Sequence, residues 1–472
     1  MFDFLKQKKA IDIYQAAEIL KTNPELLQQF EAAYSASNIS GEMSDNLFDI
    51  NAKQMAALVD KDAVISEDVE AMINQIVADL AAETPIWRYD GKKVDHIHLA
   101  LPEGENKEIT VQDISRLPEN VRPQLTANLM KRDIGQPSYL ELLEVYHNYQ
   151  TCRNSHNKER WYHMFRQGLD ILDLDAITYE MIGTNKNSMG YWLPRIVDAV
   201  DAQGYFKIPK TTIIKVPLTM LQLTRCEYMG LTPTTFAIVD RFCQKVFDLH
   251  EDEEYFIKTG TYSSKYDFRN AHVKGPKEVR ELGEYLLFIH FQALQMASPL
   301  SQPTIYGVST TNEWVVREFI QDKENNPCIY NGMPLHTEYR VFVDFDTKEV
   351  LGANPYWDPK VMKERFSKGT DADSSKMKHD YVVYSMHEKT LMSRYSENVK
   401  NVIDKIERLL PNIDMSGQWS IDIMQNGDDF YLIDMAAAAN SALNHCIPAK
   451  KLRALPENWI PEITMNALPW GK

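Results

Sequence analysis

The spacing of apolar residues changes from helical to strand-like along the chain. From residue 8 to about residue 82, apolar side chains recur at the three- and four-residue intervals of amphipathic helices. From Pro85 onward short alternating segments appear, and an Asp-Gly turn interrupts the first of them. Helical and strand-like segments then mix, without an internal repeat. The pattern predicts an α+β protein with a helical N-terminal region, residues 1–84, and an accessory or substrate domain, residues 85–204.

The second half of the chain contains the clearest elements. Helices are predicted over Thr234–Leu249, Glu278–Met296 and Val399–Leu410. Strands are predicted at Tyr255–Lys258, Trp314–Ile320 and Thr337–Asp344. Residues 358–390 carry many lysines among Ser, Gly and Asp, and we expect a mobile basic loop there. Such a loop could guide an anionic ligand, or it could be solvated without any ligand.

Two apolar runs near the C-terminus, WSIDIM and FYLIDM, flank an Asn-Gly sequence that is typical of a β-hairpin turn. Alternation along the first strand puts Asp422 on the face opposite to Ile421. A turn centred on Asp428 would place Asp422 directly across from Asp434. Two facing carboxylates repel each other, and a hard cation such as Mg²⁺ between them would remove the conflict. The alternative is a slipped turn that leaves one aspartate on the solvent face.

Composition limits the class of protein. The chain has 472 residues, of which 44% are hydrophobic and 25% charged, enough for two to four folded domains. Its net charge of −16 argues against nucleic acid as the main partner. The N-terminus lacks the order of a secretory signal, and no apolar run is long enough to span a membrane. Five scattered cysteines without a CxxC fit a reducing compartment, so we expect a cytoplasmic protein.

Two groups of histidine and cysteine residues are weak metal candidates. His96 and His98 share one face of a strand but lack an evident third ligand, so ordinary strand histidines are the default interpretation. Cys152, His156 and His163 match no zinc spacing, and a helical surface that faces a partner is the simpler interpretation.

Other polar residues lie where strands end or face a ligand. Lys258 ends a buried-looking strand and precedes a loop of small residues, 259–264, where its charge and the loop N–H groups could bind phosphates. The Walker A pattern is absent from the chain. One face of a predicted strand carries Glu338, Arg340 and Asp344. This face either contacts a ligand or is an ordinary solvated surface.

The order of these segments resembles the nucleotide-binding core of the ATP-grasp superfamily over roughly residues 205–450. The segments WVVREFI, TEYRVFV and FYLIDM are most similar to the eukaryotic translation-initiation-factor assembly chaperones within that superfamily. The resemblance does not cover the first 200 residues. It implies a two-lobed C-terminal module, with one lobe over residues 205–325 and the other over residues 326–472, that holds ATP between the lobes.

The resemblance also implies a role for individual residues. Lys215 and Lys258 would contact the phosphates of ATP, and the backbone of Glu318, Phe319 and Ile320 would contact the adenine edge. The implied remainder of the site is Asp322 or Glu324 for the ribose, Arg340 for the γ-phosphate or an acyl phosphate, and Asp422 and Asp434 for Mg²⁺.

One departure from the family pattern concerns the metal. The family commonly has an acid, one intervening residue and then Asn, whereas Asp434 is followed by Met435 and Ala436. Asn440 is the nearest replacement, and it could serve only if residues 436–439 loop back. A weakened metal site would mean altered chemistry, or nucleotide binding without turnover.

The leading hypothesis is an ATP- and Mg²⁺-dependent ligase that activates a carboxylate as an acyl phosphate for attack by an amine, with Arg340 and Lys258 as catalytic groups. Its substrates would be small molecules or proteins. The alternative is an ATP-binding assembly, chaperone or regulatory protein with little turnover and a protein partner that binds the N-terminal half. Phosphotransfer to a polar acceptor would use the same site, and a protein that binds no nucleotide is the simplest remaining possibility.

Overall fold

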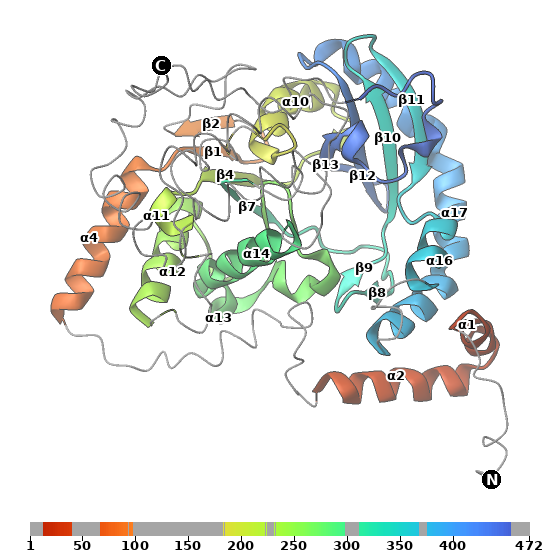
Figure 1. The fold of residues 1–472 in the computed structure, drawn as a ribbon, viewed down its shortest axis with the longest axis horizontal. Helices are drawn as coiled ribbons and strands as arrows, with labels where there is room; N and C mark the ends of the chain where they lie inside the picture. Colours follow the sequence, from red (N-terminus) through yellow and green to blue (C-terminus); the bar gives the residue numbers. More distant parts are fainter. Residues whose placement is uncertain are drawn as a thin grey trace, which may run out of the picture.

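The computed structural model of the chain describes residues 13–39, 67–92, 94–97, 185–221, 233–297, 311–367 and 375–454, together with residues 183, 223 and 231. These residues form a mixed α+β architecture with two principal sheets, which confirms the α+β fold class (Figure 1). Within the described residues, no helix is long and apolar enough to cross a membrane.

The first sheet has six strands, and every neighbouring pair is antiparallel. In spatial order the strands are β2 (Val94–Ile97), β1 (Ile86–Tyr89), β4 (Thr211–Lys215), β7 (Glu313–Glu318), β5 (Tyr255–Thr259) and β6 (His272–Val273). The apolar sides of several helices build a core against it: α4 (Glu67–Glu83), α11 (Leu218–Leu221), α12 (Pro233–Phe247), α13 (Gly275–Arg280) and α14 (Leu282–Ala297). This burial leaves the other face of the sheet for contacts with the second sheet.

The second sheet has five strands and lies beside the first (Figure 1). Its spatial order is β11 (Glu349–Pro355), β10 (Thr337–Asp344), β12 (Gln418–Asn426), β13 (Asp429–Ala437) and β3 (Phe206–Lys207). Two helices, α10 (Met189–Gln203) and α17 (Ser375–Leu409), contribute to the core of this sheet. That core also contains Trp87 and Ile213 from the first sheet, so a continuous apolar cluster joins the two sheets.

Smaller elements complete the described fold. A short hairpin of β8 (Cys328–Ile329) and β9 (Met333–Pro334) shares a third core cluster with α1 (Ile13–Thr22), α16 (Pro359–Ser367) and α17. The helix α2 (Pro24–Ile39) carries Glu31, which is 2.7 Å from Nε2 of His379 on α17. Helices α1 and α2 therefore pack against α17 in the second half of the chain, whereas α4 packs against α12. Four 3₁₀ turns lie at Lys265–Asn270, Leu410–Asn412, Ala438–Asn440 and Asn444–Cys446.

Most predicted elements of the second half are confirmed, and one prediction is wrong. Residues 359–367 and 375–390, which we expected in a mobile basic loop, belong to α16 and to the start of α17. Apolar side chains between the lysines explain the difference, because Met362, Tyr381, Val382 and Tyr384 are buried against β8 and β9. The lysines concealed a helical pattern that only packing reveals.

The domain limits stay a prediction. Strand β1 and helix α10 both come from residues 85–204, yet β1 pairs with β4 in the first sheet and α10 packs into the shared core. His96 lies in strand β2. The other weak metal candidates, His98, Cys152, His156 and His163, lie outside the described residues.

Candidate functional site

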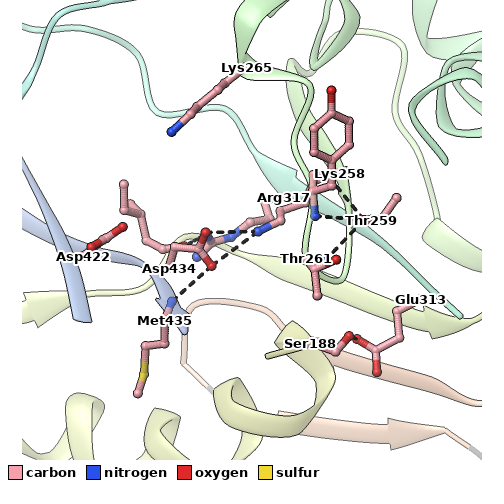
Figure 2. A network of polar contacts seen from close by, with 12 residues as sticks. Ser188, Lys258, Thr259, Thr261, Lys265, Glu313, Arg317, Asp422, Asp434 and Met435 are labelled. Carbon is pink, nitrogen blue, oxygen red and sulfur yellow. Dashed lines mark hydrogen bonds and ion pairs between the residues drawn. The ribbon is translucent and has the colours of Figure 1, made fainter. Parts of the chain in front are cut away.

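A cavity lies between the two sheets, and both sheets contribute to its wall. Figure 2 shows polar side chains of this cavity together with neighbouring residues, with Lys258 and Arg317 pointing towards Asp434. The residues that line the cavity are Pro209, Phe256, Lys258, Ser263, Lys265, Phe268, Arg317, Glu318, Phe319, Ile320, Met333, Pro334, His336, Glu338, Tyr356, Trp357, Asp422, Met424, Ile433 and Asp434. Residues that are widely separated in the sequence therefore share one cavity.

The predicted opposition of Asp422 and Asp434 is confirmed, although the turn differs from the prediction. The loop consists of residues 427 and 428, and regular pairing counted back from it would put Ile433 opposite Asp422. A β-bulge beside Asp422 adds one residue to β13 and brings Asp434 opposite instead. Since a one-residue shift moves a side chain to the other face, the bulge puts Asp434 on the side of the sheet that Asp422 already occupies, and both line the cavity.

A positively charged side chain already contacts each aspartate. On β10, Arg340 lies directly across from Asp422 and donates through Nε to Oδ1 at 2.8 Å and through Nη2 to Oδ2 at 2.6 Å. Burial acts to lower the pKa of Arg340, but Asp422 outweighs it and raises the pKa. Lys258 is only 3% exposed, and its Nζ lies 3.4 Å from both carboxylate oxygens of Asp434. The two contacts neutralise the repulsion that the hairpin would otherwise impose.

Arg317 is a site residue that sequence reasoning missed. From β7 it donates through Nη1 to the backbone oxygen of Ile433, the residue beside the bulge, at 2.7 Å, and through Nε to Thr211. Its Nη2 has no hydrogen-bond partner within the described part of the chain. Burial lowers the pKa of Arg317 to about 10. A charged residue inside the apolar strand WVVREFI was the signal that could have identified it.

Glu338 and Lys265 also line the cavity without having been assigned to it. Burial, together with the nearby charge of Asp422, raises the pKa of Glu338 to about 8. Nζ of Lys265 lies 4.6 Å from the ring centroid of Tyr356, and the guanidinium of Arg340 lies 4.7 Å from the same centroid. At neutral pH Glu338 therefore keeps its proton, and the cavity carries more positive charge than a count of its acidic residues would indicate.

The segment predicted to contact adenine does line the cavity. Glu318, Phe319 and Ile320 border it, beside apolar side chains that include Phe256 and Met424. The backbone N–H of Phe319 donates to Glu254, and its ring stacks on His272 with the centroids 3.7 Å apart. The connector that follows is also fixed, because the side chain of the buried Asn426 donates to Gln321 and accepts from the N–H of Lys323, both at 2.9 Å. The hairpin thus holds the end of this segment.

Asp322 and Glu324 lie close to His336 in a compact group. Asp322 accepts hydrogen bonds from the backbone N–H groups of Glu324 and Asn326, and Glu324 forms an ion pair with Arg394. Asp322 lines a neighbouring hollow rather than the main cavity. These carboxylates are therefore engaged in the turn that follows the adenine segment.

Like Asp322 and Glu324, three further predicted residues are not among those that line the cavity: Lys215, Asn440 and Arg340, the last of which contacts the lining residue Asp422. Lys215 forms an ion pair with Glu313, which also accepts a hydrogen bond from the N–H of Gly190 at the start of α10. Asn440 lies in the 3₁₀ turn after β13, and its side-chain oxygen is 3.5 Å from Nδ2 of Asn187. Because β13 continues as a strand through Ala437, Asn440 is carried past Asp434.

The donor set suits a hard divalent cation only in part. Asp434 is accessible, with 43% of its side chain exposed, whereas the side chain of Asp422 is 7% exposed and both its oxygens accept from Arg340. Mg²⁺ binds through one or two carboxylates together with phosphate oxygens and water. Asp434 can supply such a carboxylate.

Comparisons with known proteins return similar structures but no sequence match. No protein-family model and no curated protein matches the chain. Among solved structures, it is similar to C-terminally truncated Cdc123 from Schizosaccharomyces pombe, with 13% identity and a TM-score of 0.32, over 60% of this chain and 96% of that chain. It is also similar to Cdc123 from the same organism, with 12% identity and a TM-score of 0.29, over 54% of this chain and 84% of that one.

We predict that Arg317→Lys destabilises the fold, by about 1–3 kcal/mol, although it keeps the positive charge. A lysine lacks the planar fork that lets Arg317 reach Ile433 and Thr211 together. Urea unfolding monitored by circular dichroism measures the change. Arg280→Lys on the exposed side of α13 is the matched control, since Arg280 pairs only at the surface with Glu251. Equal losses in the two variants would contradict this role.

We predict that the unfolding free energy of Glu338→Gln, relative to that of the wild type, increases as pH rises from about 5 to about 8. This difference between the two proteins is called the stability gap. The unfolded Glu338 loses its proton near 4.5, whereas the folded one keeps it to about 8. Wild-type stability therefore falls across this window, by at most about 1.4 kcal/mol per pH unit, and the glutamine variant lacks this contribution. Unfolding free energies of both proteins at several pH values measure the gap. A gap that is independent of pH would contradict the shifted pKa.

Proposed function

We propose that the cavity binds ATP together with a divalent metal, within an ATP-grasp-like module whose lobes are residues 205–325 and 326–472. One observation carries the proposal. The segments assigned from sequence to phosphate (Lys258), adenine (residues 318–320) and metal (Asp422 and Asp434) come from separate strands and line the same cavity.

The adenine end has the chemistry that a flat, mostly apolar base requires. Phe256, Phe268, Met424 and Ile320 offer apolar surface, and the backbone of residues 318–320 lies at its edge. Binding sites for small molecules combine such apolar walls with a few fixed polar groups. Asn426 keeps the following connector in place through two hydrogen bonds.

The charged residues of the cavity provide the charge that a triphosphate requires. Although the chain carries a net charge of −16, four cationic side chains gather around the two aspartates: Lys258, Lys265, Arg317 and Arg340. Glu338 adds little negative charge below pH 8 because its pKa is raised. The buried Nη2 of Arg317, which lacks a partner among the described residues, supports an anionic ligand in the cavity.

Nucleotide binding that controls a protein interaction fits the geometry better than rapid ligation. Arg340, the group assigned to the γ-phosphate, is held by two short hydrogen bonds to Asp422. Ala436 offers no metal ligand at the position where the family pattern has Asn. We therefore infer an ATP-binding assembly or regulatory protein with a cytoplasmic location, and the N-terminal half would supply the protein-binding surface.

A carboxylate–amine ligase remains the second candidate function, favoured by the position of Arg340 beside the cavity wall. Release of Arg340 from Asp422 would let it neutralise charge on a transferring phosphoryl group. If the protein is a ligase, incubation with ATP, Mg²⁺, a carboxylate panel and hydroxylamine produces a hydroxamate and ADP. Tight ATP binding without either product favours the assembly or regulatory function.

We predict that the wild type binds ATP in the presence of Mg²⁺ and that Lys258→Met weakens this binding about ten- to hundredfold, because a charged hydrogen bond to phosphate is lost. Isothermal titration of the full-length protein measures both dissociation constants. Lys277→Met is the matched control, because Lys277 is exposed on α13 and does not line the cavity. Failure of the wild type to bind ATP would contradict the proposed function.

A further inference from the structure

The two aspartates of the cavity differ in their availability to a metal. Both oxygens of Asp422 accept short hydrogen bonds from one guanidinium, and this pair is almost completely buried. Asp434 accepts one backbone hydrogen bond, from the N–H of Met435 at 3.0 Å, and faces one ammonium group at the longer distance of 3.4 Å, while 43% of its side chain is exposed. A bidentate arginine contact is the stronger and more directional of the two.

A metal ion that used Asp422 would have to separate a buried ion pair. That step leaves the Arg340 guanidinium without its principal partner in a site of low exposure, which is strongly unfavourable. Oδ1 of Asp434 accepts a hydrogen bond from the backbone N–H of Met435, so a metal that binds through Oδ2 of Asp434 needs only the displacement of Nζ of Lys258. The same lysine is placed to contact a phosphate, so a nucleotide would give the displaced ammonium a new partner.

A metal ion that binds without a nucleotide gives the displaced ammonium of Lys258 no new partner. Lys258, Lys265 and Arg317 line the cavity and Arg340 pairs with Asp422, so these four cations outnumber Asp422, Asp434 and Glu318. A divalent cation alone would add charge to a site that already has an excess of positive charge. A triphosphate reverses that balance because it carries more negative charge than one Mg²⁺ neutralises. Mg²⁺ also retains phosphate oxygens and water as ligands wherever the protein provides few carboxylates.

We propose that this cavity holds its divalent metal through one protein carboxylate, Asp434, and that the metal binds only together with the nucleotide. The Arg340–Asp422 pair stays closed and keeps Asp422 out of the metal's coordination shell. This proposal rests on the proposed function and specifies which form of ligand the site accepts, a metal–nucleoside triphosphate complex. Of the three metal ligands expected from the sequence, Asp422, Asp434 and Asn440, only the carboxylate of Asp434 remains.

The test uses Mn²⁺ as a paramagnetic substitute for Mg²⁺ and full-length protein. Electron paramagnetic resonance measures free Mn²⁺ during titration, with and without saturating ATP, and isothermal titration measures ATP binding without metal. We expect the wild type to take up Mn²⁺ only in the presence of ATP. A titration of Mn²⁺ with ATP but without protein gives the reference for Mn²⁺–ATP in solution. Relative to this reference, the affinity for Mn²⁺ in the presence of ATP should be about tenfold or more weaker in Asp434→Asn than in the wild type, while metal-free ATP binding persists.

Asp422→Asn and the exposed loop variant Asp428→Asn should both retain nucleotide-dependent Mn²⁺ uptake within about threefold of the wild type. Thermal melting shows whether each variant folds. If Asp422→Asn does not fold, the double variant Asp422→Asn/Arg340→Gln replaces it, since removing both partners leaves no buried charge unpaired. Because Arg340 is assigned to the γ-phosphate, metal-free ATP binding of the double variant is measured first, and its Mn²⁺ uptake is compared with that of the wild type at equal ATP occupancy.

Two results would overturn the proposal while leaving the proposed function intact. One is Mn²⁺ binding to the wild type of equal affinity with and without ATP. The other is a loss of Mn²⁺ uptake in a folded Asp422 variant as large as the loss in Asp434→Asn, with metal-free ATP binding preserved in both. A wild type that binds no ATP under any condition overturns the proposed function and this inference together.

Discussion

The β-bulge beside Asp422 is the constraint on which the rest of the site depends. Without it, β13 would present Ile433 rather than Asp434 opposite Asp422. The bulge also brings the carbonyl of Ile433 to Arg317 of the first sheet, and this hydrogen bond links the two sheets at the cavity. One irregular residue in the ladder thus places a carboxylate and joins the walls that surround it.

Charge compensation follows from this geometry. The two facing aspartates are tolerated because Arg340 neutralises one across β10 and Lys258 approaches the other from β5. The two contacts differ in strength, since a bidentate guanidinium holds Asp422 and a single ammonium group lies near Asp434. A symmetrical pair of acids in the sequence is therefore an unequal pair in the fold.

The rigid surroundings of the cavity come from elements that lie far from it in sequence. Trp192 of α10 packs in one cluster with Trp87 of the first sheet and Trp419 of the second, and this cluster joins the sheets behind the cavity. Asn426 fixes the connector after β7 to the hairpin turn. These contacts hold residues 318–320 and the charged residues in a single arrangement, which is what precise ligand binding requires.

The sequence by itself determined the strands β5, β7, β10 and β12–β13, because period-two alternation and turn residues are local signals. The predicted opposition of Asp422 and Asp434 is confirmed, but it depends on a β-bulge that the sequence pattern did not predict. The sequence also did not determine the lysine-rich helix α16 or the start of α17, residues 375–390, whose buried apolar side chains share a core cluster with β8 and β9. Nor did it separate Lys258, which reaches the cavity, from Lys215, which pairs with Glu313. Only the tertiary structure decided these points, because the partner that neutralises a buried charge lies on a strand distant in sequence.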